Sequence, residues 1–220
     1  MIFFLVFPVA KFASSAMGLK ERLMYSKIGL AGILLLAVLV SGAAAVDNML
    51  ENSDFQNGTE GYSFGTDYGE FALDPSVPGI VGSTALARVD SVGANAWEPE
   101  LHSPPFDLEQ GKTYTYSFWA KTEPGVTRDL SCSFEQLDIW VGIGETITIN
   151  DQWQEYHYTG EWVEPGSPPQ VVIHVGFEFL LDDVWFSHFL VYEGDYVEEE
   201  LASVTPMDSS ATSWGKIKSR

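Results

Sequence analysis

The stretch from 133 to 141 carries an amide, a carboxylate and an indole at alternate positions, Gln136, Asp138 and Trp140. Aliphatic side chains fill the positions between them, so a strand here would place the two sets on opposite faces. Sugar recognition uses polar groups that bind hydroxyls and an aromatic plane that stacks on the apolar side of a pyranose ring. The pattern therefore predicts a sugar-binding surface. The residues expected to face the core are Leu137, Ile139 and Val141.

A second alternation, from 112 to 121, combines aromatic side chains with small hydroxyl residues and ends at Trp119. Its period of two residues is that of a β-strand with two different faces. If the aromatic residues face the core, Trp119 faces outward and joins Trp140 in one groove. The residues expected in the core are Tyr114, Tyr116 and Phe118.

Three further side chains are candidates for the same site. Trp97 follows a short loop and would lie at the rim, whereas His174 and Arg88 would be polar supports on exposed strand faces. The alternative for each tryptophan is packing in the core or at a sheet edge, which is what we expect for Trp153 and Trp185.

Catalytic and metal-binding patterns find little support in the sequence. Glu178, Asp182 and Asp183 lie close together, as paired acids do in glycoside hydrolases, but the intervening apolar residues break strict alternation. The four histidines lack metal-ligand spacing, and there is no glycine-rich phosphate loop. We therefore predict no catalytic residues, no metal ligands and no cofactor. The single cysteine, Cys132, is expected to be a small buried apolar residue.

The elements that must position these residues are strands. Short alternating runs bounded by Gly, Pro, Asn and Asp recur throughout residues 46–197, and no segment there shows a helical period over three turns. This predicts an all-β fold, with two antiparallel sheets packed as a jelly-roll β-sandwich. The expected strands are 48–52, 61–64, 69–73, 84–89, 97–106, 112–121, 129–141, 145–149, 153–161, 170–176 and 184–192.

The sequence divides into three parts. Residues 1–45 contain an apolar run from Ile28 to Val40 followed by small residues, which predicts an N-terminal signal peptide and export, or a membrane anchor if it is uncleaved. Residues 46–197 form the expected β-sandwich, and residues 198–220 an acidic and then Ser- and Thr-rich tail. The tail's last apolar and basic residues, Trp214 to Lys218, are either a docking peptide or a solvated end.

The charge restricts the partners. The chain has 11 Lys and Arg against 31 Asp and Glu, a formal net charge of −20 at pH 7. Such a field repels nucleic acid, anionic lipid and anionic polysaccharide, and it suits neutral ligands or cations.

The order of several short motifs resembles the carbohydrate-binding modules of the cellulase and xylanase type, which have a galactose-binding-like β-sandwich. The resemblance covers residues 47–194 and implies a non-catalytic sugar-binding jelly roll with a neutral glycan as partner. A structural or adhesion module without a glycan ligand, and a jelly-roll hydrolase or lyase, are the alternatives. The matching segments are Asn48 to Gln56, Gly61-Tyr62, Ala85 to Val89, Trp97, Leu108 to Tyr114, Ser117 to Lys121, Trp153 to Tyr156, Val184 to Phe186 and Tyr192-Glu193.

The same resemblance implies one structural calcium, but this sequence departs from the family at the positions concerned. Gln56 stands where the family usually has Glu, and Ser187 and His188 stand where it usually has paired Asp. Because calcium prefers charged oxygen ligands, these changes predict that the usual calcium site is absent.

Overall fold

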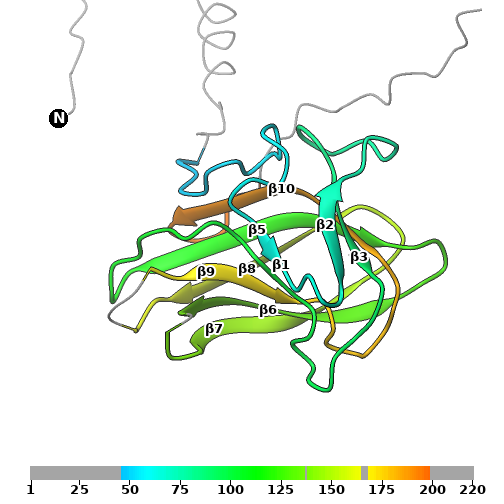
Figure 1. Cartoon of the computed structure of the whole chain (residues 1–220). Coiled ribbons are helices and arrows are strands. Elements are labelled where there is room, and N and C mark those ends of the chain that lie inside the picture. Colours follow the sequence, from blue (N-terminus) through cyan, green and yellow to red (C-terminus); the bar gives the residue numbers. More distant parts are fainter. Residues whose placement is uncertain (1–45, 137, 165–167, 199–220) are drawn as a thin grey trace, which may run out of the picture. The chain divides into compact units, whose positions relative to one another are not determined.

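The computed structural model describes residues 46–136, 138–164 and 168–198, and within them the chain forms ten β-strands (Figure 1). Five strands make each of two antiparallel sheets. Sheet A has the order β1-β4-β9-β6-β7, and sheet B the order β2-β3-β10-β5-β8. The strands are β1 (Ser63–Phe64), β2 (Gly69–Leu73), β3 (Ala85–Val89), β4 (Glu100–His102), β5 (Thr113–Thr122), β6 (Arg128–Gln136), β7 (Val141–Ile149), β8 (Gln154–Glu161), β9 (Gln170–His174) and β10 (Val184–Glu193).

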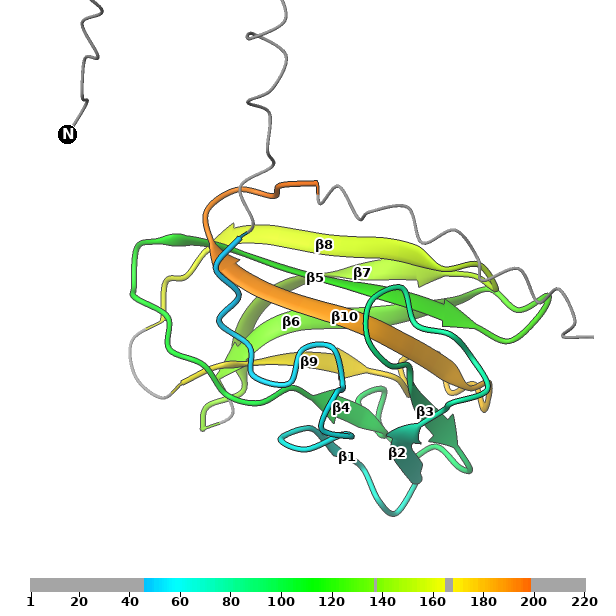
Figure 2. The same cartoon turned by 90° about the horizontal axis from the view of Figure 1, so that it is seen from above.

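The two sheets lie one above the other, which confirms the predicted all-β sandwich. Figure 2, seen from above, shows β8, β5 and β10 of sheet B in front of β7, β6 and β9 of sheet A. Every strand pair that the structure describes is antiparallel. Each sheet therefore has one face against the core and one face outside.

The core confirms the inward residues predicted for β5, although Thr115 and Ser117 between them are buried as well. Tyr114, Tyr116 and Phe118 are at most 2% exposed and pack between the sheets. The hydroxyl of Tyr116 donates a hydrogen bond of 2.9 Å to the carbonyl of Cys132 on β6, and so joins the sheets across the core. Cys132 is buried as predicted, and burial raises the pKa of its thiol.

A buried arginine, which the sequence did not single out, lies at the beginning of β6. Arg128 is 1% exposed, and its guanidinium donates to the carbonyls of Val175 and Asp182. Burial lowers the pKa of this guanidinium. The two hydrogen bonds fix the segment that follows β9 against β6.

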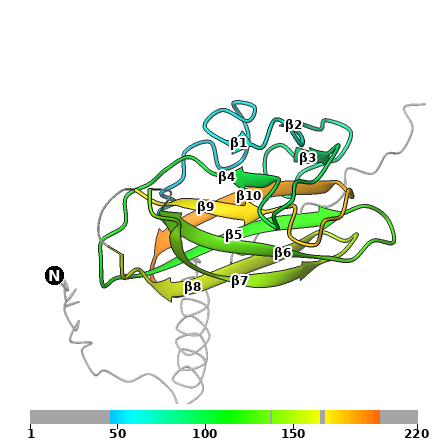
Figure 3. The same ribbon diagram turned by 60° about the horizontal axis from the view of Figure 1, so that its bottom comes forward.

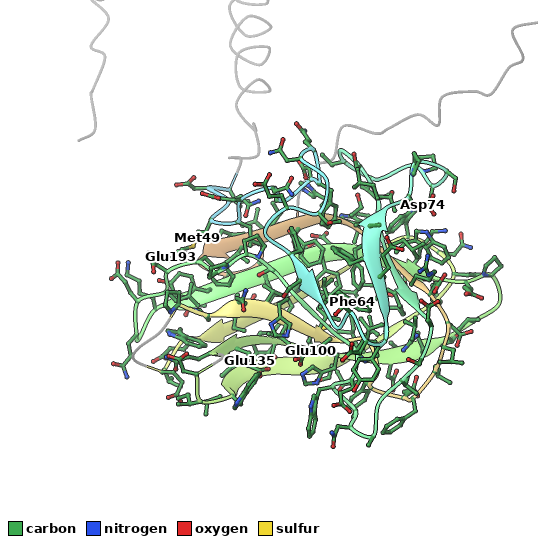
Figure 4. All side chains as sticks on the ribbon, in the orientation of Figure 1. Met49, Phe64, Asp74, Glu100, Glu135 and Glu193 are labelled. Atoms are coloured by element: carbon green, nitrogen blue, oxygen red, sulfur yellow. The ribbon has the colours of Figure 1, made fainter. Side chains whose placement is uncertain are left out.

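Several predicted strands differ from the structure: the predicted strand 97–106 is reduced to β4, residues 100–102, and two others differ more deeply. Residues 48–52 are not a strand, although Met49 donates its backbone N–H to Val191 of β10 at 2.7 Å and lies beside the end of that strand, near Glu193 (Figure 4). The predicted strand 129–141 is wrong in its second half, because β6 ends at Gln136 and a turn leads into β7. The short connection makes β6 and β7 a hairpin.

The positions associated with the family's calcium hold other contacts. Ser187 is buried and its hydroxyl bonds with the backbone of Ile80 and Val81, while His188 Nδ1 lies 2.6 Å from Asp54 Oδ1. Gln56 is exposed. An amide, a hydroxyl and an imidazole do not fit the carboxylate-rich set that calcium prefers. Among the described residues, no group of three or more His, Cys, Asp or Glu is placed to hold a metal ion.

The predicted signal or anchor segment, residues 1–45, and the tail from 199 to 220 with its Trp214 to Lys218 motif lie outside the described residues. Within the described residues, no helix has the length and hydrophobicity needed to cross a membrane.

Candidate functional site

A pocket of about 460 Å³ opens on sheet A. Two indoles, two carboxylates and one imidazole line it, and all five come from sheet A or from the loops at its strand ends. Figure 3 brings the sheet A side of the sandwich forward. The lining residues are Trp97, Glu100, Glu135, Trp140 and His174.

The polar side chains of the pocket come from three neighbouring strands. Glu100 of β4 pairs with His174 of β9, and His174 in turn pairs with Ser131 of β6. Glu135 lies four residues further along β6, on the same face as Ser131 because strand side chains alternate. In Figure 4 the labels of Glu100 and Glu135 stand next to each other over the lower strands of the view. The register thus brings residues distant in sequence to one place.

Two histidines and a serine surround the two carboxylates. His174 Nε2 lies 3.7 Å from Glu100 Oε2 and 4.0 Å from Glu135 Oε2. His102 Nε2 lies 3.0 Å from the other oxygen of Glu100, and the Ser133 hydroxyl donates to Glu135 at 3.1 Å. Burial lowers the pKa of His174, although both carboxylates act in the opposite direction. The lowered pKa favours the neutral imidazole at pH 7.

The loop before β4 presents Trp97, whose side chain is 49% exposed. The carboxylate of Glu98 accepts hydrogen bonds from the backbone and side chain of Asn95, at 3.1 and 3.2 Å, and the Glu98 carbonyl accepts one from Gly93. A Cβ at Gly93 would lie 2.1 Å from the Glu98 carboxylate, so this close turn requires glycine. The turn fixes the backbone on both sides of Trp97.

The hairpin turn between β6 and β7 presents Trp140, which is 65% exposed. The Trp140 backbone N–H donates to the carbonyl of Gln136 at 2.9 Å, and Trp140 has a φ of 54°, in the left-handed region. Gly142 and Gly144 follow on β7, where Cβ atoms would meet the carbonyls of Phe134 and Cys132 at 2.3 and 2.0 Å. Two positions without a side chain thus lie on β7, next to the turn that carries Trp140.

The predicted trio of Gln136, Asp138 and Trp140 does not share one face. Gln136 is 3% exposed and ends the strand on the buried side, whereas Asp138 and Ile139 are exposed in the turn. Strand alternation ends where the strand ends, so parity cannot be carried across the turn. Of the three, only Trp140 lines the pocket.

Trp119 and Arg88 belong to the other sheet, so the prediction of one groove shared by Trp119 and Trp140 is wrong. Trp119 lies on β5 of sheet B, opposite Ser187 and Glu155. Arg88 lies on β3 of the same sheet and makes an ion pair with Glu70 at 3.1 Å. Outward faces of the two sheets of a sandwich point in opposite directions.

Trp153 and Trp185 are half-buried around a lysine on sheet B. The Lys121 Nζ lies 5.7 Å from the ring of Trp153 and 4.8 Å from the ring of Trp185. The Trp185 indole N–H also donates to Asp74 at 2.9 Å. Cation–π contacts of this kind stabilise the exposed face of a sheet, which agrees with the packing role expected for these residues.

Sequence reasoning missed Glu100 and Glu135, although a signal for Glu135 was present. Leu130, Cys132 and Phe134 form an apolar alternation that places Glu135 on the outer face, and all three are buried. Alternation counted forward from these buried residues therefore places Glu135 on the correct, outer face. Glu100 lacks such a signal, because β4 is only three residues long.

The acids that superficially suggested a hydrolase have structural partners. Glu178 accepts a hydrogen bond from the Asp129 backbone at 2.6 Å, and Asp183 accepts one from the Val89 backbone at 3.0 Å. Burial raises the pKa of Asp183. These two carboxylates hold different strands and do not share the pocket.

The sequence of residues 47–176 matches the family described as "Carbohydrate binding domain". The chain belongs to the carbohydrate binding domain family. The match includes all five residues that line the pocket of this carbohydrate binding domain. Membership supports carbohydrate binding by a non-catalytic module and confirms the resemblance seen in the sequence. A search of curated proteins finds no match.

Solved structures share the fold of this carbohydrate binding domain. The structure described as "CBM4 structure and function" is 18% identical with a TM-score of 0.55, and the match covers 66% of this chain and 99% of the other. An arabinose-bound GH51 α-L-arabinofuranosidase is 14% identical with a TM-score of 0.52, over 71% of this chain and 28% of the enzyme.

The CBM22-1 and GH10 modules of xylanase 10B from Clostridium thermocellum, in complex with xylohexaose, are 16% identical to this chain with a TM-score of 0.50. The match covers 69% of this chain and 30% of that one. At such identities the likeness concerns the fold alone.

Proposed function

We propose that this domain binds a polysaccharide or oligosaccharide that lacks anionic groups, such as a neutral glycan, and that it does not catalyse a reaction of this ligand. The observation that carries the proposal is the pocket on sheet A, where Trp97 and Trp140 are exposed beside the polar side chains of Glu100, Glu135 and His174. Indole faces stack on the apolar side of a pyranose, and carboxylate and imidazole groups bind its hydroxyls.

The charge of the chain supports the same class of ligand. A net charge of −20, with two carboxylates in the pocket itself, disfavours uronic acids and sulfated glycans. Sugar hydroxyls exchange hydrogen bonds with water for hydrogen bonds with protein at small net gain. We therefore expect dissociation constants between micromolar and millimolar, roughly 4 to 8 kcal/mol of binding free energy.

Titration calorimetry with xylan, β-glucan, mannan and galactan oligosaccharides tests the proposal. Binding of at least one glycan by the wild type, weakened in Trp97→Ala, is the expected result. A suitable control is Val163→Ala, because Val163 is also exposed, at 47%, but does not line the pocket. If the wild type binds no glycan in a broad panel, or if Trp97→Ala binds as tightly as the wild type, the proposal fails.

A further inference from the structure

The pocket holds two carboxylates whose nearest basic groups, within the described residues, are histidines. Glu100 lies near His102 and His174, and Glu135 lies near His174. The side chains of Glu100 and Glu135 are only 23% and 13% exposed. Carboxylates so far removed from water are normally paired with cations.

The central imidazole does not supply that cation at neutral pH. His174 lies within 4.0 Å of an oxygen of each carboxylate. Burial lowers the pKa of His174 and so favours the neutral ring. The pocket is thus a small negatively charged space beside two exposed indoles.

A divalent metal ion is one kind of cation that a negatively charged space attracts. The described residues contain no group of three or more His, Cys, Asp or Glu arranged to hold one. An organic cation has no such requirement for a complete ligand set. An ammonium group has three N–H donors for carboxylate oxygens, and it is attracted to the face of an indole.

We propose that the pocket selects a glycan with free amino groups, and that the ammonium of one glucosamine-type unit lies between Glu100 and Glu135. This inference rests on the proposed function and narrows it, because only the substituent on the sugar changes. The ring stacks on an indole as a neutral sugar would, and the ammonium adds a charge–charge attraction to each carboxylate. The net charge of the chain attracts the same ligand from a distance.

Three pentasaccharides with one β-1,4-linked backbone test this inference, because they differ only in the group on C2. They are the glucosamine pentamer with free amines, its fully N-acetylated form, and cellopentaose with hydroxyls. Calorimetry at pH 6.5 and 150 mM salt should show that the amine form binds about ten-fold more tightly than cellopentaose.

The variant that removes both charges is Glu100→Gln with Glu135→Gln. We expect the ratio of the two dissociation constants to fall from about ten to about one in this variant, whatever the change in absolute affinity. The matched control is Glu51→Gln with Glu60→Gln, which removes the same charge from exposed positions on a different loop. The control should keep the wild-type ratio.

The outcomes separate this inference from the proposed function. Equal affinity of the wild type for all three pentasaccharides overturns the inference and leaves glycan binding standing. A ratio that survives in the Glu100 and Glu135 variant, or that falls equally in the control, shows general attraction to an acidic protein and also overturns it. If neither these pentasaccharides nor any glycan of the broader panel binds, both proposals fail.

Discussion

Replacing Trp140 by alanine should weaken glycan binding without affecting the fold. An aromatic side chain of this size presents roughly 200 Å² of surface, and Trp140 is 65% exposed, so about 130 Å² is available. A sugar ring covers one face, or about 65 Å². At about 25 cal/mol per Å² this amounts to about 1.6 kcal/mol, which raises the dissociation constant roughly 15-fold.

The structure offers a closely matched control in Phe179. Phe179 is 50% exposed, has a φ of 59° compared with 54° for Trp140, and does not line the pocket. Trp140→Ala and Phe179→Ala therefore remove similar exposed side chains from similar backbone conformations. The free energy of unfolding of both variants should lie within about 0.5 kcal/mol of the wild-type value, as expected for exposed positions.

Calorimetry with the tightest glycan of the panel measures the two affinities, and urea unfolding measures the two stabilities. The reasoning is refuted if Trp140→Ala binds within two-fold of the wild type, or if Phe179→Ala loses as much affinity as Trp140→Ala. A large loss of stability in Trp140→Ala would also contradict it, because the indole would then have a packing role.

Four further outcomes are expected. Trp119→Ala should leave glycan affinity unchanged in calorimetry, because its strand belongs to the sheet opposite the pocket. Tyr116→Phe should lower the free energy of unfolding in urea by about 1 kcal/mol, because it removes the buried hydrogen bond to β6; no change would contradict that role. Gly144→Ala should cost about 1 to 3 kcal/mol in the same assay, because its Cβ would lie 2.0 Å from a backbone carbonyl. Burial lowers the pKa of His174, so the unfolded chain binds a proton at this imidazole more readily than the folded chain does. The free energy of unfolding should therefore fall as the pH drops below about 6.5. If the free energy of unfolding of His174→Gln depends on pH as steeply as that of the wild type, His174 is not the group responsible.

The fold was largely predictable from the sequence because period-two alternation depends on local residue types. The apolar alternation of β5 gave the correct core, and residues 69–73 were predicted as the strand that the structure shows. The positions of strand ends were less predictable, because turns such as the one at Trp140 depend on backbone geometry that residue types do not specify.

The site was predicted only in part, because sheet membership is decided by long-range pairing. Trp97, Trp140 and His174 were named from local patterns and do meet in one pocket. Trp119 shows an equally persuasive local pattern but pairs into sheet B. Glu100 meets His174 only through the register of β4 and β9, which no local pattern encodes.

The burial of Cys132 has a practical consequence for measuring ligands. It is the single cysteine of the chain and is 1% exposed, so a thiol reagent reaches it only when the core opens. A ligand that binds only the closed domain reduces the open population by a factor of one plus the ratio of ligand concentration to dissociation constant. At a fixed glycan concentration, the decrease in the rate of thiol labelling therefore reports the dissociation constant of the glycan.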